Sequence, residues 1–299
     1  MAPFSPVSPD RFEPRHYSAS DGLRLYYRAY GDPLAPSPAV LCLPGITRNA
    51  KDFHDLACRL AAQGRRVICP DYRGRGRSGY DPDWRNYRPE TYIGDLQQLL
   101  TLEGIGRFVA IGTSMGGLLT MGLAVARPAG LAATVLNDIG PEIEPGGVSR
   151  IIDYIGQDHP QPDWAAAIAH LKATYPELGL PHERAWLNLA RSTFREADDG
   201  RLHVDWDITL ARPLRESGPI PDLWPLFRAL DRRPVLVIRG GSSDVLSDGS
   251  LAKMIAAKPD LIHVTLPGVG HAPMLDEPAA LEAIDALFAR LDRPHLDGQ

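Results

Sequence analysis

The stretch FVAIGTSMGGLL, residues 108–119, decides the fold of this chain. Its first residues are apolar or favour β-structure and its last residues are helix formers, so it predicts a buried strand that turns directly into a helix. Ser114 occupies the turn between Gly112 and Gly116, in the pattern Gly-x-Ser-x-Gly. Such a turn can lift a serine hydroxyl clear of a sheet only where the neighbouring residues lack side chains that would collide. Ser114 is therefore a candidate nucleophile.

Similar strand signals recur on both sides of this stretch and alternate with helical periodicity. Continuous apolar runs predict strands within 39–45, 65–74, 131–140, 234–241 and 262–268, and amphipathic spacing predicts helices within 51–64 and 91–105 and a final helix after residue 276. Short connections between alternating strands and helices indicate right-handed βαβ units and a mostly parallel sheet. Asp21-Gly22 predicts a hairpin turn ahead of them.

The alternation is interrupted once, over residues 141–222. This segment has helical patches, several prolines and Trp164, Trp186 and Trp206, but no strong buried strand. We predict a helical insertion at 141–222 in an α/β core of residues 17–140 and 223–299. Residues 1–16, punctuated by prolines and without an apolar run of secretory length, are expected to form an N-terminal arm.

Composition narrows the classes of function. The chain has 299 residues, a net charge of −5, 44% hydrophobic and 23% charged residues and a pI near 6.0, which gives no electrostatic footprint for nucleic acid or an anionic membrane. No apolar run approaches the roughly 18 residues of a spanning helix, so the cytoplasm is the expected compartment. The chain has three cysteines, Cys42, Cys58 and Cys69, which is an odd number, and their spacing suits neither a zinc site nor a disulfide framework. We expect them to be buried thiols. No metal site is expected.

A serine nucleophile needs a base within hydrogen-bond reach and a carboxylate that orients that base. His271 follows the last predicted strand in the loop LPGVGHAPMLDEP, and loops at the carboxyl ends of parallel strands form the sites of open α/β sheets. We predict His271 as the base. Asp244, in the polar loop RGGSSDVLS, is the favoured acid because it follows a strand and completes the chain order serine, acid, histidine. Asp138, at the end of an earlier strand in VLNDIG, is the alternative acid.

An oxyanion hole requires two backbone N–H donors, each worth about 3 kcal/mol of the barrier. The amide of Met115, at the start of the helix after Ser114, is the first candidate. The amide of Ile46, after the strand AVLCLPG, is the second. Arg48 and Asn49, near this loop, are candidate substrate contacts, with solvent exposure as the alternative. Tyr154 and Trp164 of the predicted insertion are further candidates, with packing as the alternative.

Taken together, five motifs resemble the α/β-hydrolase superfamily over about residues 17–291: LPGITRN, DYRGRGRS, GTSMGG, RGGSSDVLS and VGHAPMLDEP. The resemblance implies an eight-stranded, mostly parallel sheet flanked by helices, and no cofactor. It also implies that the helical insertion at 141–222 is a cap, or lid, over the site. It also implies the roles assigned to Ser114, Asp244 and His271. The chain has Pro44-Gly45 where the family usually has His-Gly before the oxyanion loop.

The function expected from this resemblance is hydrolysis of a carboxylic ester or lactone of a small, apolar molecule through an acyl-enzyme. A serine nucleophile argues against relatives that need an aspartate, such as haloalkane dehalogenases and epoxide hydrolases. Two alternatives stay open: a hydrolase of carbon–carbon bonds in a ring-cleavage product, and a ligand receptor with an idle triad. Neither nucleic acid nor membrane is expected as a partner, and a homodimer is one option for the quaternary state.

Overall fold

A computed structural model describes residues 11–293 except 181, 217 and 219. Its centre is an eight-stranded sheet with the order β1-β2-β4-β3-β5-β6-β9-β10. The strands are β1 (Glu13–Ser18), β2 (Arg24–Tyr30), β3 (Ala39–Leu43), β4 (Val67–Asp71), β5 (Phe108–Thr113), β6 (Leu131–Asn137), β9 (Val235–Gly240) and β10 (Ile262–Leu266). The strand β2 is antiparallel to both β1 and β4, and the remaining pairs are parallel. The predicted mostly parallel sheet is confirmed.

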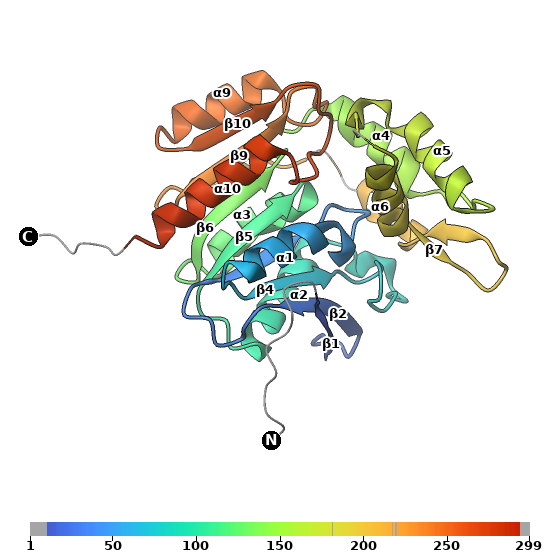
Figure 1. The fold of residues 1–299 in the computed structure, drawn as a ribbon, viewed down its shortest axis with the longest axis horizontal. Coiled ribbons are helices and arrows are strands. Elements are labelled where there is room, and N and C mark those ends of the chain that lie inside the picture. Colours follow the sequence, from blue (N-terminus) through green and yellow to red (C-terminus); the bar gives the residue numbers. More distant parts are fainter. Residues whose placement is uncertain (1–10, 181, 217, 219, 294–299) are drawn as a thin grey trace, which may run out of the picture.

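Helices cover both faces of the sheet, which is why the central strands are apolar on both sides (Figure 1). One core contains residues of α1 (His54–Ala62) and α10 (Pro278–Leu291). The other contains residues of α2 (Pro89–Leu102), α3 (Met115–Ala126), α8 (Trp224–Arg228) and α9 (Asp248–Ala257). Every residue of β3, β4, β6 and β9 is buried. The sheet is therefore a rigid platform for the loops at its carboxyl edge.

Between β6 and β9 the chain leaves the sheet and forms α4 (Pro145–Ile155), α5 (Trp164–Thr174), α6 (Glu183–Thr193) and α7 (Ala211–Glu216). These helices alternate with short 3-10 turns at 176–178 and 208–210, and further 3-10 turns precede α1 at 50–53 and α2 at 84–86. In Figure 1, α4, α5 and α6 stand together beside the sheet. The segment also contains a small hairpin of β7 (Phe194–Glu196) and β8 (Leu202–Val204). These strands have three residues each, too few to give a periodic sequence signal.

At the amino-terminal end, the structure shifts one predicted boundary. Residues 1–10 of the predicted arm lie outside the described residues. Glu13 already pairs with Ala29 in the sheet, so the last residues of that arm belong to β1. No disulfide joins the three cysteines, which lie within the described residues: Cys42 and Cys69 are buried and Cys58 is half-buried. In the part of the chain that the structure describes, no helix is both long and apolar enough to cross a membrane.

Candidate active site

Ser114 lies at the sharp turn between β5 and α3, as the opening motif predicts. Its backbone has φ 53° and ψ −118°, a conformation that costs of order 1–3 kcal/mol and is found where function requires it. A Cβ added to Gly112 would lie 2.4 Å from the backbone of Gly116, and one added to Gly116 would lie 2.0 Å from the carbonyl oxygen of Leu43. The two glycines are therefore required by close backbone approach, which holds the serine above the sheet.

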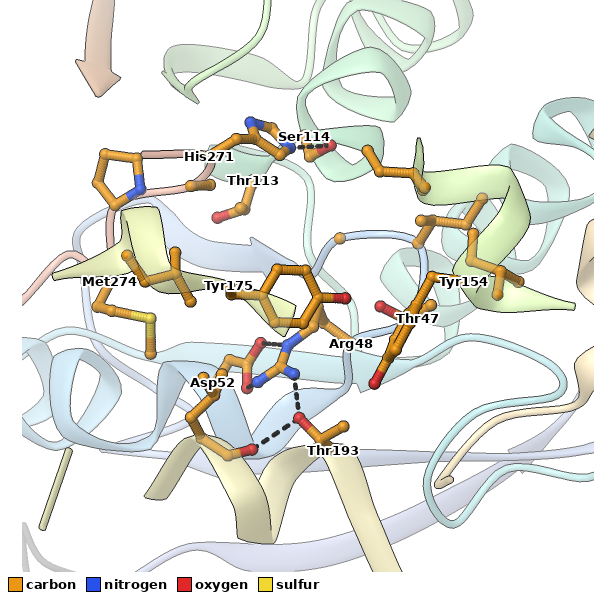
Figure 2. Close-up of a pocket in the computed structure, with 18 of the residues that line it drawn as sticks. Thr47, Arg48, Asp52, Thr113, Ser114, Tyr154, Tyr175, Thr193, His271 and Met274 are labelled. Atoms are coloured by element: carbon orange, nitrogen blue, oxygen red, sulfur yellow. Dashed lines mark hydrogen bonds and ion pairs between the residues drawn. The ribbon is translucent and has the colours of Figure 1, made fainter. Parts of the chain in front are cut away.

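The structure brings Ser114 and His271 into contact. His271 Nε2 lies 3.0 Å from Ser114 Oγ, and Figure 2 shows the two side chains facing each other at one side of a pocket. The other ring nitrogen, Nδ1, lies 2.7 Å from Asp138 Oδ2. The Asp138 side chain is fully buried and that of His271 nearly so. An alcohol, an imidazole and a carboxylate thus form one hydrogen-bonded row, the arrangement that activates a serine.

The acid in this row is Asp138, so the assignment of Asp244 from the sequence is corrected. Asp244 is exposed in the loop after β9, where its carboxylate accepts hydrogen bonds of 2.8–3.1 Å from Arg150. Asp138 is buried, and its Oδ1 accepts a hydrogen bond of 2.8 Å from the amide of Gly240 at the end of β9. The strands β6 and β9 are neighbours in the sheet, so the acids that follow them, Asp138 and Asp244, lie at the same edge. The two acids differ in burial.

Asn137 is a site residue that the sequence analysis missed. Its carbonyl oxygen accepts a hydrogen bond of 2.9 Å from the amide of Ser114. Its side-chain amide donates to the carbonyl oxygen of Pro273, at 2.9 Å, and to Thr113 Oγ1, at 3.0 Å. One buried asparagine therefore links the nucleophile's strand to the loop that carries His271. An asparagine at the end of an otherwise apolar strand was the available signal.

The two predicted oxyanion donors lie where the sequence placed them. Met115 is the first residue of α3, where backbone N–H groups lack partners within the helix. Ile46 lies in the loop after β3 and lines the pocket. Its carbonyl oxygen accepts a hydrogen bond of 2.7 Å from Arg75 Nε, and Arg75 Nη2 lies 4.0 Å from Met115 Sδ. Arg75 is fully buried, so this guanidinium fixes the loop that carries one candidate donor and contacts the residue that carries the other candidate.

Above Ser114 is a cavity of about 130 Å³. Its walls come from the core loops and from the segment between β6 and β9. Most of the walls are apolar, formed by Ile46, Phe53, Ile151, Ile155, Leu178, Leu189, Trp206, Pro273, Met274 and Leu275. The polar lining includes Arg48 and Tyr154, as predicted, and also Asp52, Arg150, Tyr175 and Thr193. Burial raises the pKa of Tyr154 to about 12, so its hydroxyl stays protonated and can donate.

Two predicted substrate contacts lie elsewhere. Asn49 is fully buried and does not line the pocket. Its side chain accepts from the amide of Lys51 and donates to the carbonyl oxygen of Ser192, which ties the loop after β3 to α6. Trp164 begins α5, and its indole N–H donates to Glu196 at 3.3 Å, away from the pocket. Both predictions were wrong because proximity in sequence to a site does not fix the direction of a side chain.

Comparison with known proteins agrees with this geometry. Residues 40–284 match the sequence model of the Alpha/beta hydrolase family. This match spans most of the chain, and with the fold it shows that the chain belongs to the α/β hydrolase family.

Two relatives of this chain are hydrolases. A 3-hydroxybutyrate-oligomer hydrolase from Cupriavidus necator is 33% identical over 274 residues, which cover 89% of this chain and 92% of that protein. A 2-(acetamidomethylene)succinate hydrolase from Mesorhizobium japonicum is 29% identical over 235 residues, which cover 78% of this chain and 81% of that protein. Among solved structures, an alpha/beta hydrolase from Novosphingobium aromaticivorans superposes with a TM-score of 0.88 at 48% identity, covering 93% of this chain and 98% of that one.

Proposed function

We propose that this chain is a serine hydrolase that cleaves a small carboxylic ester or lactone through an acyl-enzyme. The observation that carries the proposal is the row of hydrogen bonds from Ser114 Oγ to His271 Nε2, at 3.0 Å, and from His271 Nδ1 to Asp138 Oδ2, at 2.7 Å. The hydrolase activities of the relatives agree with it.

In the first half of the reaction, Ser114 Oγ attacks the ester carbonyl while His271 Nε2 takes the hydroxyl proton. Asp138 accepts a hydrogen bond from Nδ1–H, which fixes the tautomer that leaves Nε2 free to accept and stabilises the imidazolium that forms. The amides of Met115 and Ile46 donate to the carbonyl oxygen as it becomes negative. His271 then donates its proton to the leaving alcohol, and Ser114 is left acylated.

The second half repeats this chemistry with water. His271 removes a proton from a water molecule, the resulting hydroxide adds to the acyl carbon, and the tetrahedral intermediate is held by the same two amides. Its collapse releases the carboxylic acid and returns the proton to Ser114. The buried pocket walls restrict bulk water and so strengthen each of these hydrogen bonds.

Pocket size and wall chemistry support a small substrate. A cavity of about 130 Å³ is well below the ~300–1,000 Å³ of pockets for drug-sized ligands. Residues 141–222 are proposed to act as the cap, because α4 and α6 supply part of the wall. The relative that hydrolyses 3-hydroxybutyrate oligomers makes esters of short hydroxy acids the first compounds to test.

A two-part experiment tests the proposal. The wild type should release p-nitrophenol from p-nitrophenyl acetate and butyrate with an initial burst, and a fluorophosphonate should label Ser114. Ser114→Ala should abolish both signals, while Ser242→Ala, which alters an exposed serine in the loop after β9, should retain them. No turnover and no labelling in the folded wild type would refute the proposal and favour the receptor alternative. Labelling without ester turnover would direct the search to carbon–carbon substrates.

A further inference from the structure

One side of the pocket differs in charge from the rest of its lining. Among the described residues that line it, two arginines, Arg48 and Arg150, are accompanied by a single carboxylate, Asp52. Two tyrosines, Tyr154 and Tyr175, line the same pocket, with ring centroids 5.5 Å apart. Figure 2 shows Arg48, Tyr154 and Tyr175 across the pocket from the Ser114–His271 pair. We call Arg48, Arg150, Tyr154 and Tyr175 the arginine–tyrosine side.

Arg48 is held rigidly on this side. Its Nε and Nη2 donate to the two oxygens of Asp52 at 2.6 and 2.7 Å, Nη1 donates to Thr193 at 2.6 Å and Nη2 to Ser192 at 2.5 Å. These four bonds leave one of the five guanidinium N–H groups, on Nη1, for a further acceptor. Burial opposes the charge, but Asp52 holds the pKa of Arg48 above its usual value.

The nucleophile is close to this arginine. A Cβ placed on Gly45 would lie 3.3 Å from Arg48 Cγ and 3.9 Å from Ser114 Cβ. The stem of Arg48 and the side chain of Ser114 thus flank the same glycine, and both residues line the pocket. Arg48 and Asp52 together are neutral, however, so this pair orients a polar group but does not by itself attract an anion.

Arg150 is the second guanidinium group on this side. Its guanidinium carbon lies 5.9 Å from the centroid of the Tyr175 ring, and its partner Asp244 lies outside the pocket lining. Both members of this ion pair are more than a third exposed, and such surface pairs contribute only about 0–1 kcal/mol. Exchange of Asp244 for another carboxylate therefore costs little.

The tyrosines complete the surface as donors. Burial raises the pKa of Tyr154 and of Tyr175 above the ordinary value, so both phenols keep their protons at neutral pH. An anion on this side would meet two guanidinium groups and two hydroxyl donors, which is the donor chemistry that carboxylates prefer.

We propose that the arginine–tyrosine side binds a free carboxylate of the substrate, so that the preferred substrates are esters that also carry a carboxylate, such as oligomers of short hydroxy acids. This inference rests on the proposed ester hydrolysis. It also goes beyond it, because it replaces a small apolar substrate with an anionic one.

A pair of matched substrates tests this preference: the linear dimer of 3-hydroxybutyrate and its primary amide, which has nearly the same shape and no charge. Release of 3-hydroxybutyrate or its amide is followed by chromatography. We expect kcat/KM to be about 10- to 100-fold higher for the acid, the range for hydrogen bonds to a charged group. The difference should appear mainly in KM.

Variants assign the effect to the arginines. Arg150→Gln and Arg48→Gln should each lower the acid-to-amide ratio of kcat/KM at least fivefold. Asp244→Asn is the matched control, because it removes the surface partner of Arg150 and should keep the ratio or raise it. If Arg48→Gln does not fold because Asp52 loses its partner, the wild-type ratio and Arg150→Gln still decide the question.

The outcomes separate this inference from the proposed function. Equal kcat/KM for acid and amide, with p-nitrophenyl esters still cleaved and Ser114 still labelled, would overturn the carboxylate side alone. A ratio that Arg150→Gln leaves unchanged would overturn the role of Arg150. Absence of all ester turnover and labelling would instead refute the proposed function.

Discussion

Replacement of Asp138 by asparagine is the sharpest test of the site, because its neighbours dictate the orientation of the new side chain. Asp138 Oδ1 accepts from the amide of Gly240 at 2.8 Å, and Oδ2 faces His271 Nδ1 at 2.7 Å. An asparagine must keep its carbonyl oxygen toward Gly240, since a buried N–H without an acceptor costs about 1–3 kcal/mol. Its NH₂ group then faces His271.

This orientation forces the wrong histidine tautomer. With an N–H donor opposite, Nδ1 must be the acceptor, so the proton moves to Nε2 and the ring can no longer accept from Ser114. In a serine–histidine–aspartate triad this change lowers kcat about 10⁴-fold, or about 5.5 kcal/mol of barrier. Asp138→Asn should therefore lower kcat for p-nitrophenyl butyrate by about four orders of magnitude and slow fluorophosphonate labelling in parallel.

Asp244→Asn is the control, because Asp244 is the residue that the sequence analysis favoured as the acid. It removes only an exposed ion pair with Arg150, so kcat should stay within about twofold and stability within about 1 kcal/mol. Circular dichroism and thermal unfolding of both variants would establish that the fold is intact. Activity of Asp138→Asn within tenfold of the wild type, or an equal loss in Asp244→Asn, would refute the assignment of the acid.

Three further predictions concern the surroundings of the site. Gly116→Ala should destabilise the chain by several kcal/mol, because the added methyl would lie 2.0 Å from the carbonyl oxygen of Leu43; a urea midpoint equal to the wild type's would contradict this. Arg75→Met should lower kcat about 10- to 100-fold with little change in KM, because the carbonyl of Ile46 loses its donor and the oxyanion loop loosens. Arg75→Lys should restore part of kcat, and a change confined to KM would argue against the positioning role. Burial raises the pKa of Asp71 to about 6 from 3.8. Between these two pH values the carboxyl is protonated in the native chain and ionised in the unfolded chain. This carboxyl should lower the free energy of unfolding by up to about 3 kcal/mol as pH rises from about 4 to about 6. Urea unfolding of Asp71→Asn should lack that component, and identical pH slopes for the two proteins would exclude it.

The local features of the fold were predictable because each has a strong signal in the chain. Buried strands read as continuous apolar runs, and Gly-x-Ser-x-Gly marks a turn that only glycines permit. Both Ser114 and His271 follow such signals and meet as expected. The mostly parallel sheet was predicted for the same reason, whereas its eight strands were implied by the resemblance to the α/β-hydrolase superfamily.

The sequence could not decide between the two candidate acids, because the choice depends on how deeply each carboxylate is buried and not on the order of residues in the chain. Asp138 and Asp244 both follow strands that end at the same edge of the sheet. Asp138 is flanked by residues that prove buried, whereas Asp244 is itself exposed and follows Gly241, Ser242 and Ser243, which prove half-buried or exposed. The neighbours of a carboxylate in the chain are thus a better guide to an acid's burial than the order of residues in a motif.

Contacts between residues far apart in the chain also could not be predicted from the sequence. Arg75 reaches Ile46 and Tyr92 over 29 and 17 residues along the chain, and Arg48 reaches Thr193 over 145. Such pairs depend on how the segment between β6 and β9 settles on the sheet, which no local periodicity encodes.

The position of the acid constrains how this scaffold can be re-engineered. Only Ile139 and Gly140 lie between Asp138 and the point at which the chain leaves the sheet. Gly140 is tightly enclosed, because a Cβ there would lie 2.6 Å from Met254 Sδ. A chimaera that exchanges the segment between β6 and β9 for that of a relative should keep its first splice point beyond Pro141. A junction nearer the strand would alter the proton relay along with the substrate range, and the two effects could not be told apart.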